Sequence, residues 1–293
     1  GGGTGGTLTA NRLLRLYRHE HQAVHITVVD QDNFHVYQPG LLFVPFGLAH
    51  EQDIVRPRGE QLHKAVHYVQ CAIDHVDSAA DRVVLADGSE LPYDVLVIAT
   101  GARLAVEETE GLTGDGWNES VFTFYDMAGA LALHDALESF ERGALLVNVV
   151  DLPIKCPVAP LEFCFLADWY FTERGIRDQV DIVYATPLDG AFTKPVASAK
   201  LKALLEEKGV NLVTEFNTGE VDGVGRKLIS YDGREVPFDL AVVVPLHSGA
   251  EYVGRSEGIG DDLNFVPVDK GTLQTHAKAN IDRKSTRLNS SHT

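Results

Sequence analysis

Cysteine is scarce in this chain, whose 293 residues include only Cys71, Cys156 and Cys164. Three cysteines do not form a disulfide framework, so the composition indicates a reducing compartment. No stretch reaches the roughly 18 apolar residues of a membrane-spanning helix, and no signal peptide is visible. We therefore expect a cytoplasmic protein without a membrane-spanning segment.

Basic residues are also few. The chain has 25 Lys and Arg residues against 42 Asp and Glu residues, which gives a formal net charge of −17. Proteins that bind nucleic acid present a basic face, so this charge argues against a nucleic-acid partner. Apolar residues make up 44% of the chain, which suffices for a large core. The length allows two domains, or one domain interrupted by another.

The first thirty residues carry the clearest functional pattern. Gly1–Gly6 read GGGTGG, a helical spacing of apolar residues follows, and a β-branched run over 24–29 ends at Asp30. In G-x-G-x-x-G the first glycine makes a tight turn, the second lets backbone N–H groups approach a pyrophosphate, and the third packs the helix on the sheet. The acid holds a ribose hydroxyl. The pattern predicts a dinucleotide site.

This glycine motif normally follows a strand, and no residue of the sequence precedes Gly1. We therefore expect that the first strand of the fold is missing. At the other end, residues 282–293 have one apolar residue in twelve and no periodicity, and they resemble the translation of a sequencing adapter. We expect this tail to be non-native and leave it out of the fold.

Strands and helices alternate along the rest of the chain. Strands alternating with helices of roughly 10–15 residues predict a parallel α/β architecture. The aromatic and proline-rich segment 33–47 is expected to be a buried loop. The sequence predicts strands at 66–72, 94–99, 144–150, 180–185, 210–213 and 239–244, and helices at 126–141, 158–174 and 195–208.

An internal repeat supports two units of the same kind. The segment 87–94, DGSELPYD, recurs at 232–239 as DGREVPFD, and each copy runs into an apolar strand. Five identical residues share one offset, and each Asp-Gly pair is a turn signal between two strands. The repeat therefore predicts a duplicated architecture with two dinucleotide-binding-type units.

The second unit lacks the glycines of the first. After the strand at 144–150 the chain reads DLPIKCPVAPLE over 151–162, with three prolines and no glycine. Prolines remove backbone N–H donors that a pyrophosphate needs, and side chains block its close approach. We expect that the second unit has lost its nicotinamide site.

A cysteine stands where the second glycine motif would be. Cys156 precedes a predicted helix, with Pro157 suited to the first helical position and Lys155 beside it. A helix N-terminus and a cation favour the thiolate and bring a cysteine pKa down to about 3.5–7.5. We therefore expect a redox role for Cys156 and inert, structural roles for Cys71 and Cys164.

His247 follows the last predicted strand of the second unit, where the chain should return to the first domain. Two interpretations stay open for it: a position near a cofactor ring, or an ordinary loop histidine.

At these residues the chain resembles the FAD-dependent pyridine nucleotide-disulfide oxidoreductases, flavoproteins with two dinucleotide-binding domains. Within them it resembles the sulfide:quinone oxidoreductases and the flavoprotein subunit of flavocytochrome c sulfide dehydrogenase. The motifs are GGGTGG with Asp30, YQPGLLF at 37–43, VIATGA at 97–102, the cysteine at 156, and NFVPVD at 264–269. The glycine and ATG motifs mark the superfamily, and the cysteine is the more specific mark.

The resemblance implies an α/β fold of two Rossmann-like domains, one inserted in the other, each with a parallel sheet and a β-meander. It divides the chain into an FAD domain at 1–110, a second Rossmann-like domain at 111–244 with a degenerate NAD site, and a return to the FAD domain at 245–281. The implied cofactor is FAD. It would be held by Gly1, Gly3, Thr4, Gly5, Gly6, Asp30, Gln31, Tyr37, Pro39, Ala72, Thr100, Gly101 and Arg103.

The resemblance also implies the chemistry. Cys156 matches the family cysteine that takes up sulfide-derived sulfur and passes electrons to the flavin, which then reduces a quinone or a similar acceptor. A peripheral contact with the cytoplasmic membrane would be made by a C-terminal part beyond residue 281. Two alternatives remain from the sequence: a type II NADH:quinone reductase of the same fold, and a non-enzymatic redox sensor that uses flavin and thiol. No metal site is expected.

Overall fold

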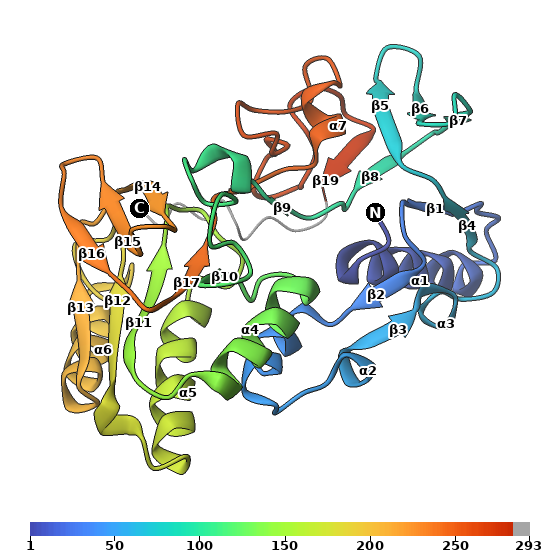
Figure 1. The fold of residues 1–293 in the computed structure, drawn as a ribbon. Coiled ribbons are helices and arrows are strands. Elements are labelled where there is room, and N and C mark those ends of the chain that lie inside the picture. Colours follow the sequence, from blue (N-terminus) through green and yellow to red (C-terminus); the bar gives the residue numbers. More distant parts are fainter. Residues whose placement is uncertain (284–293) are drawn as a thin grey trace. The chain divides into compact units, whose positions relative to one another are not determined.

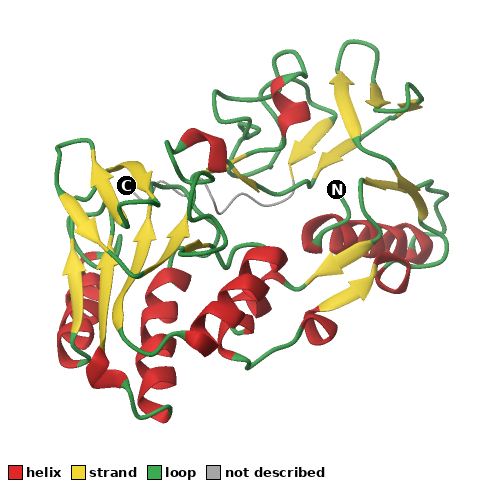
Figure 2. Cartoon of the chain, in the orientation of Figure 1, coloured by secondary structure: helices red, strands yellow, loops and turns green. Residues whose placement is uncertain are grey.

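A computed structural model describes residues 1–283 of the chain, and these residues divide into two compact units (Figure 1). Unit 1 contains residues 1–37, 55–103 and 248–283, and unit 2 contains residues 38–54 and 104–247. Along the sequence, unit 1 is thus interrupted twice, by the two segments of unit 2. The predicted α/β fold class is confirmed, because parallel strands and helices build both units (Figure 2).

Unit 2 is built on a five-stranded sheet in the order β10-β17-β11-β12-β13, with every neighbouring pair parallel. The central strands are buried on both faces, as the apolar runs of their sequences require. Leu145, Leu146 and Val147 of β11 are fully buried. The five strands are β10 (Val121–Phe122), β11 (Gly143–Val149), β12 (Val180–Ala185), β13 (Val210–Val213) and β17 (Leu240–Val244).

Three helices accompany this sheet: α4 (Met127–Ser139), α5 (Ala159–Glu173) and α6 (Pro195–Glu207). Their predicted positions are confirmed, with ends that differ by at most two residues. Asp126 caps α4, since its Oδ1 accepts the N–H of Gly129 at 2.7 Å. Helix α5 packs on β11 and β12, and α6 packs on β13.

The repeated segments form matching antiparallel sheets. In unit 1, β5 (Ile73–Asp77), β6 (Arg82–Leu85) and β7 (Glu90–Pro92) pair in sequence order. In unit 2, β14 (Thr218–Asp222), β15 (Lys227–Ser230) and β16 (Glu235–Pro237) do the same. Both sheets have an irregularity at the corresponding place in their first strand. The predicted duplication is therefore visible in the backbone.

Unit 1 carries two separate parallel pairs, β1 (Thr27–Asp30) with β4 (His67–Gln70), and β8 (Leu96–Ile98) with β19 (Ile281–Arg283). Helix α1 (Thr4–His19) buries Ala10 and Leu14 against Val28 and Val66. The other elements of the chain are short: β2 (Phe34–Val36), β3 (Val55–Pro57), β9 (Arg103–Leu104), β18 (His247–Ser248), α2 (Glu51–Ile54), α3 (Arg58–Gln61), α7 (Glu251–Gly254), and the 3-10 turns η1 (Gln38–Leu42), η2 (Val44–Phe46), η3 (Val106–Glu108) and η4 (Arg177–Gln179).

Two expectations need correction. The segment 33–47 is not wholly irregular, since it contains β2 and the turns η1 and η2. Asp282 and Arg283, assigned above to a tail outside the fold, pair in β19 with Val97 and Ile98. The guanidinium of Arg283 donates to the carbonyl of Val266 at 2.8 Å. This hydrogen bond holds a polar residue in a strand that the hydropathy of the sequence does not predict. The rest of that tail lies outside the described residues.

None of the helices in residues 1–283 is both long and apolar enough to cross a membrane.

Candidate functional site

The glycine-rich segment lies at the start of α1, as predicted. Helix α1 begins at Thr4, directly after Gly3. A Cβ added at Gly6 would lie 1.7 Å from the carbonyl oxygen of Gly1, and one added at Gly1 would lie 2.6 Å from that of Ala99. Only glycine fits these two positions without movement of the backbone. A Cβ at Gly3 would meet nothing within 4 Å, so backbone and helix N-terminus leave room there for a phosphate group.

Asp30 ends β1 beside this segment. Its Oδ2 accepts the backbone N–H of Gly2, with the two atoms 2.5 Å apart. Asp30 and the glycine segment are therefore in direct contact, although they are far apart in the sequence. Gln31, the next residue, is exposed.

Arg58 is a functional candidate that the sequence analysis missed. Its side chain is only 3% exposed, and Nη2 lies 3.5 Å from Asp30 Oδ2 and 2.6 Å from Asp32 Oδ1. The guanidinium also donates to the carbonyl oxygens of Gly2 and Phe34. A buried arginine with several acceptors holds the glycine segment and the acid together. The sequence around Arg58 does not indicate this role, because the hydrogen-bond partners of Arg58 lie 24 to 56 residues away.

Thr100 and Gly101 follow β8 in unit 1. Gly101 has a φ of +73°, which favours glycine. The Thr100 Oγ1 lies 3.3 Å from the hydroxyl of Tyr252, and burial raises the pKa of Tyr252 to about 12. A Cβ on Gly1 would lie 2.7 Å from the Cα of Thr100. The structure thus brings Gly1, Asp30 and Thr100 together at one edge of unit 1.

The remaining predicted cofactor residues are Thr4, Gly5, Tyr37, Pro39, Ala72 and Arg103. Arg103 Nε lies 3.8 Å from Glu251 Oε1, and the carbonyl of Ala72 accepts the N–H of Ala86 at 2.9 Å. Tyr37 is 58% exposed. Pro39, in η1, is exposed as well, and Thr4 and Gly5 lie in the first turn of α1. Their assignment to a cofactor stays a prediction.

Cys156, in unit 2, has an unusual backbone. Its φ is +47°, in the left-handed region that a non-glycine residue rarely adopts. Its carbonyl oxygen accepts two hydrogen bonds, from Ala159 N at 2.9 Å and from the hydroxyl of Tyr125 at 3.2 Å. The residue itself is exposed. Strained backbone of this kind is found preferentially at functional sites.

The expected thiolate is wrong for this environment. Partial burial and the carboxylate of Glu162 raise the pKa of Cys156, and the N–H groups of Ala159 and Val158 oppose this only in part. Helix α5 begins at Ala159, so Pro157 lies outside it and Cys156 is three residues before the first turn. The macrodipole acts mainly within that turn. Burial lowers the pKa of Lys155, and Asp126 opposes this shift.

His247 lies in the same part of unit 2. It is fully buried, its Nδ1 lies 2.9 Å from the carbonyl of Pro245, and its ring meets the ring of Tyr125 edge-on at 5.3 Å. Since a carbonyl only accepts, Nδ1 carries the hydrogen. Its Nε2 is buried and has no hydrogen-bond partner among the described residues. Burial and the charge of Lys155 lower its pKa to about 4. Its position near a cofactor stays a prediction.

Cys164 lies in the middle of α5 and is fully buried. Burial raises the pKa of its thiol far above the ordinary range. The interpretation of Cys164 as a structural residue is confirmed.

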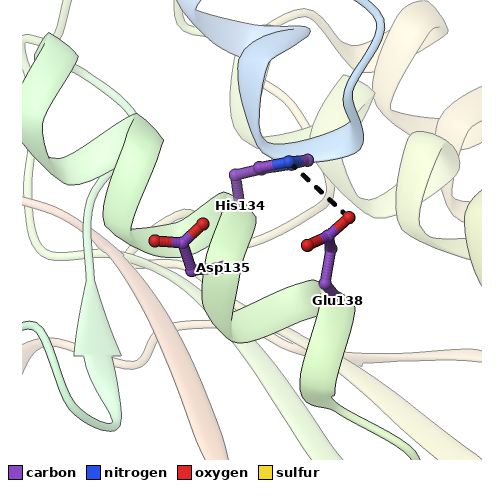
Figure 3. A group of neighbouring side chains, drawn as sticks. All are labelled: His134, Asp135 and Glu138. Carbon is purple, nitrogen blue, oxygen red and sulfur yellow. Dashed lines mark ion pairs between the residues drawn. The ribbon is translucent and has the colours of Figure 1, made fainter.

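A further group of polar side chains lies on α4 (Figure 3). Ligand-type atoms of His134, Asp135 and Glu138 lie within 4.8 Å of one another. His134 Nε2 is 3.9 Å from Glu138 Oε1, and its Nδ1 is 3.2 Å from the carbonyl of Pro45. Both carboxylates are exposed. This is the geometry of an i,i+4 ion pair on a solvated helix face, and we assign no metal to it.

Residues 1–147 match the family described as pyridine nucleotide-disulphide oxidoreductase, and this match covers half of the chain. The chain belongs to the pyridine nucleotide-disulphide oxidoreductase family. The matched region contains the glycine segment, Asp30 and Thr100, whose contacts are described above.

The predicted resemblance to sulfide:quinone oxidoreductases is confirmed within this family. A mitochondrial sulfide:quinone oxidoreductase of Dictyostelium discoideum is 27% identical over 282 residues, which cover 95% of this chain and 62% of the relative. The structure of the Aquifex aeolicus sulfide:quinone oxidoreductase superposes with a TM-score of 0.82 at 22% identity, over 97% of this chain and 66% of that one. The chain thus spans less than two thirds of the length of these relatives.

The fold is shared beyond sulfide enzymes. NDH2 of Plasmodium falciparum, in a structure that contains NADH, has a TM-score of 0.71 at 15% identity, over 97% of this chain and 62% of that one. At such identities the likeness concerns the fold alone, and the choice between donors rests on the residues of the site.

Proposed function

We propose that this chain is the FAD-binding and sulfur-reactive part of an oxidoreductase of the sulfide:quinone type. Electrons from a sulfur species would enter at Cys156 and pass through the flavin to a quinone or a similar acceptor. The observation that carries the proposal is Cys156 itself, held with a φ of +47° in the turn where the second unit has no glycine cradle. The relatives named sulfide:quinone oxidoreductase support the same assignment.

The residues of unit 1 fit the nucleotide end of FAD. Gly1 and Gly6 are positions where a side chain would collide with backbone, and Gly3 leaves open space at the N-terminus of α1. Asp30 would hold the adenosine ribose, and Arg58 would keep the acid and the glycine segment in place. Bound FAD would supply a two-electron acceptor.

Cys156 would supply the sulfur chemistry. In the proposed step the sulfur of Cys156 and that of hydrogen sulfide would form an S–S bond, and each sulfur would give up one proton. The two electrons released as two thiol-level sulfurs become a persulfide would be accepted by the bound FAD. Because partial burial and Glu162 raise the pKa of Cys156, we expect its thiol to be protonated before the reaction and to lose this proton as the S–S bond forms.

The test is an anaerobic titration of the flavin-loaded protein with sulfide, followed by flavin absorbance. Cys156→Ser should abolish sulfide-dependent bleaching while FAD stays bound, and Cys71→Ser is the matched control because Cys71 is a half-buried cysteine of unit 1. Normal bleaching in the Cys156→Ser protein would refute the assignment.

The same titration with NADH separates the two reductase classes. The three prolines and the missing glycines of 151–162 argue against nicotinamide binding in unit 2. Bleaching by NADH and not by sulfide would therefore move the function to the NADH:quinone reductases. Bleaching by neither would favour a flavin and thiol sensor.

A further inference from the structure

The left-handed backbone of Cys156 needs a cause, because this residue has a Cβ. For L-residues other than glycine this conformation is disfavoured, and it persists where the surroundings impose it. In the flanking sequence, the Ala159 N–H donates to the Cys156 carbonyl at 2.9 Å, and the N–H groups of Val158 and Ala159 also approach the thiol.

The second restraint comes from Tyr125, which is 31 residues away in sequence. Its hydroxyl donates to the same carbonyl oxygen at 3.2 Å. Its side chain is buried, with the ring of Phe124 at 4.8 Å and the ring of His247 at 5.3 Å, edge-on. Burial also raises the pKa of Tyr125 well above its ordinary value. The phenol therefore remains a hydrogen-bond donor across the working range of pH.

His247 fixes the ring in turn. It is held through Nδ1 by the carbonyl of Pro245, which directly follows β17. A continuous series of contacts thus runs from the parallel sheet of unit 2 through His247 and Tyr125 to the Cys156 carbonyl. A side chain anchored in this way transmits the rigidity of the sheet to an exposed turn.

We propose that Tyr125 is a positioning residue for Cys156, whose hydroxyl holds the turn in the left-handed conformation and so fixes where the thiol is presented. The inference rests on the proposed role of Cys156 and names a further residue for that reaction. Without the hydroxyl, the turn should relax toward ordinary φ values, and the thiol should sample positions that do not react.

The direct test measures hydrogen exchange of the Ala159 amide, which donates to the same carbonyl. Tyr125→Phe removes one oxygen and should speed this exchange by about 2- to 10-fold, the range expected for one lost hydrogen bond. Tyr184→Phe is the control, since Tyr184 is also a buried tyrosine of unit 2, but its hydroxyl bonds to Thr186. Unchanged exchange in the Tyr125→Phe protein would overturn the proposal.

A double-variant comparison separates positioning from general support. Glycine adopts a positive φ without steric cost, so in a Cys156→Gly background the loss of the Tyr125 hydroxyl should change Ala159 exchange much less. Equal effects in both backgrounds would mean that the hydroxyl merely supports the unit, and would overturn the positioning role.

A kinetic readout completes the test. The Tyr125→Phe protein should keep its FAD and reduce it more slowly with sulfide, in a single turnover, than the wild-type and Tyr184→Phe proteins do. The exchange measurements need no sulfide turnover, so they judge Tyr125 even if the proposed function fails.

Discussion

The Oδ2 of Asp30 lies 3.5 Å from the Nη2 of Arg58, and both groups contact the backbone of Gly2. Arg58 is 3% exposed and also faces Asp32 at 2.6 Å. Removing the cation would leave two carboxylates without their charge partner in a partly buried place. We therefore expect Arg58→Met to lower the free energy of unfolding by about 3 kcal/mol, as found when one partner of a buried pair is removed.

Urea denaturation measures this change. Arg56→Met is the matched control, because Arg56 is an exposed arginine two residues away, and exposed substitutions usually stay within about 0.5 kcal/mol. Equal losses in the two variants would show that the burial of Arg58 is not what stabilises unit 1.

Asp30 and Asp32 share Arg58 but should differ in cofactor binding. Asp30→Ala removes the acceptor proposed for the ribose hydroxyl, and we expect FAD to bind at least about tenfold more weakly, which is about 1.4 kcal/mol. Asp32→Ala removes the closer partner of Arg58 and should lower stability without this loss of affinity. Calorimetric titration of the apoprotein with FAD compares them. If FAD bound more weakly to the Asp32→Ala protein alone, the assignment of the ribose hydroxyl to Asp30 would be wrong.

The parts of the fold that the sequence predicted well are those governed by local patterns. Gly88 and Gly233 have φ values of +83° and +84°, as their Asp-Gly turns require. The strands on either side of each turn pair in the same register, with Arg82 opposite Pro92 and Lys227 opposite Pro237. Turn chemistry and apolar alternation act over a few residues, so one sequence suffices to read them.

Only the part of the candidate site that belongs to a single sequence motif could be predicted. Gly1, Gly6 and Asp30 belong to a single spacing pattern, and the structure brings them together. Arg58 and Tyr125 carry no such pattern, because each acts through hydrogen bonds to backbone atoms of distant residues. The raised pKa of Cys156 was not predictable for a related reason: its causes, partial burial and the carboxylate of Glu162, are set by the folded structure. In addition, α5 begins only at Ala159.

Glu162 provides a test of that raised pKa. Its carboxylate disfavours the thiolate of Cys156, so Glu162→Gln should lower the thiol pKa and shift the pH profile of iodoacetamide alkylation to lower pH. The rate at neutral pH should rise accordingly, because only the thiolate reacts. Glu173→Gln, at the exposed far end of α5, is the control. Peptide-resolved mass spectrometry follows Cys156, and buried Cys164 should stay unmodified in the folded protein. A profile that Glu162→Gln leaves in place would contradict the assigned cause.

His247 should make stability depend on acid pH. Its pKa is lowered from 6.5 to about 4 by burial and by Lys155. Above pH 6.5 the imidazole is neutral in both states. As pH falls toward 4 the unfolded chain binds a proton that the folded chain does not, so stability falls through this window and stops falling below it. The shift corresponds to about 3 kcal/mol.

Other groups titrate in the same range, so the contribution of His247 is obtained as a difference between two proteins. His247→Asn keeps an amide donor for the carbonyl of Pro245 and has no charge to gain. Its stability relative to the wild-type protein should therefore improve by about 3 kcal/mol between neutral pH and pH 4. His50→Asn, a change at an exposed histidine, controls for the loss of an imidazole. A charged His247 should be costly, because its buried Nε2 has no partner among the described residues. Parallel stability curves for the wild-type and His247→Asn proteins would contradict this, because they would mean that the folded protein accommodates His247 in its charged form.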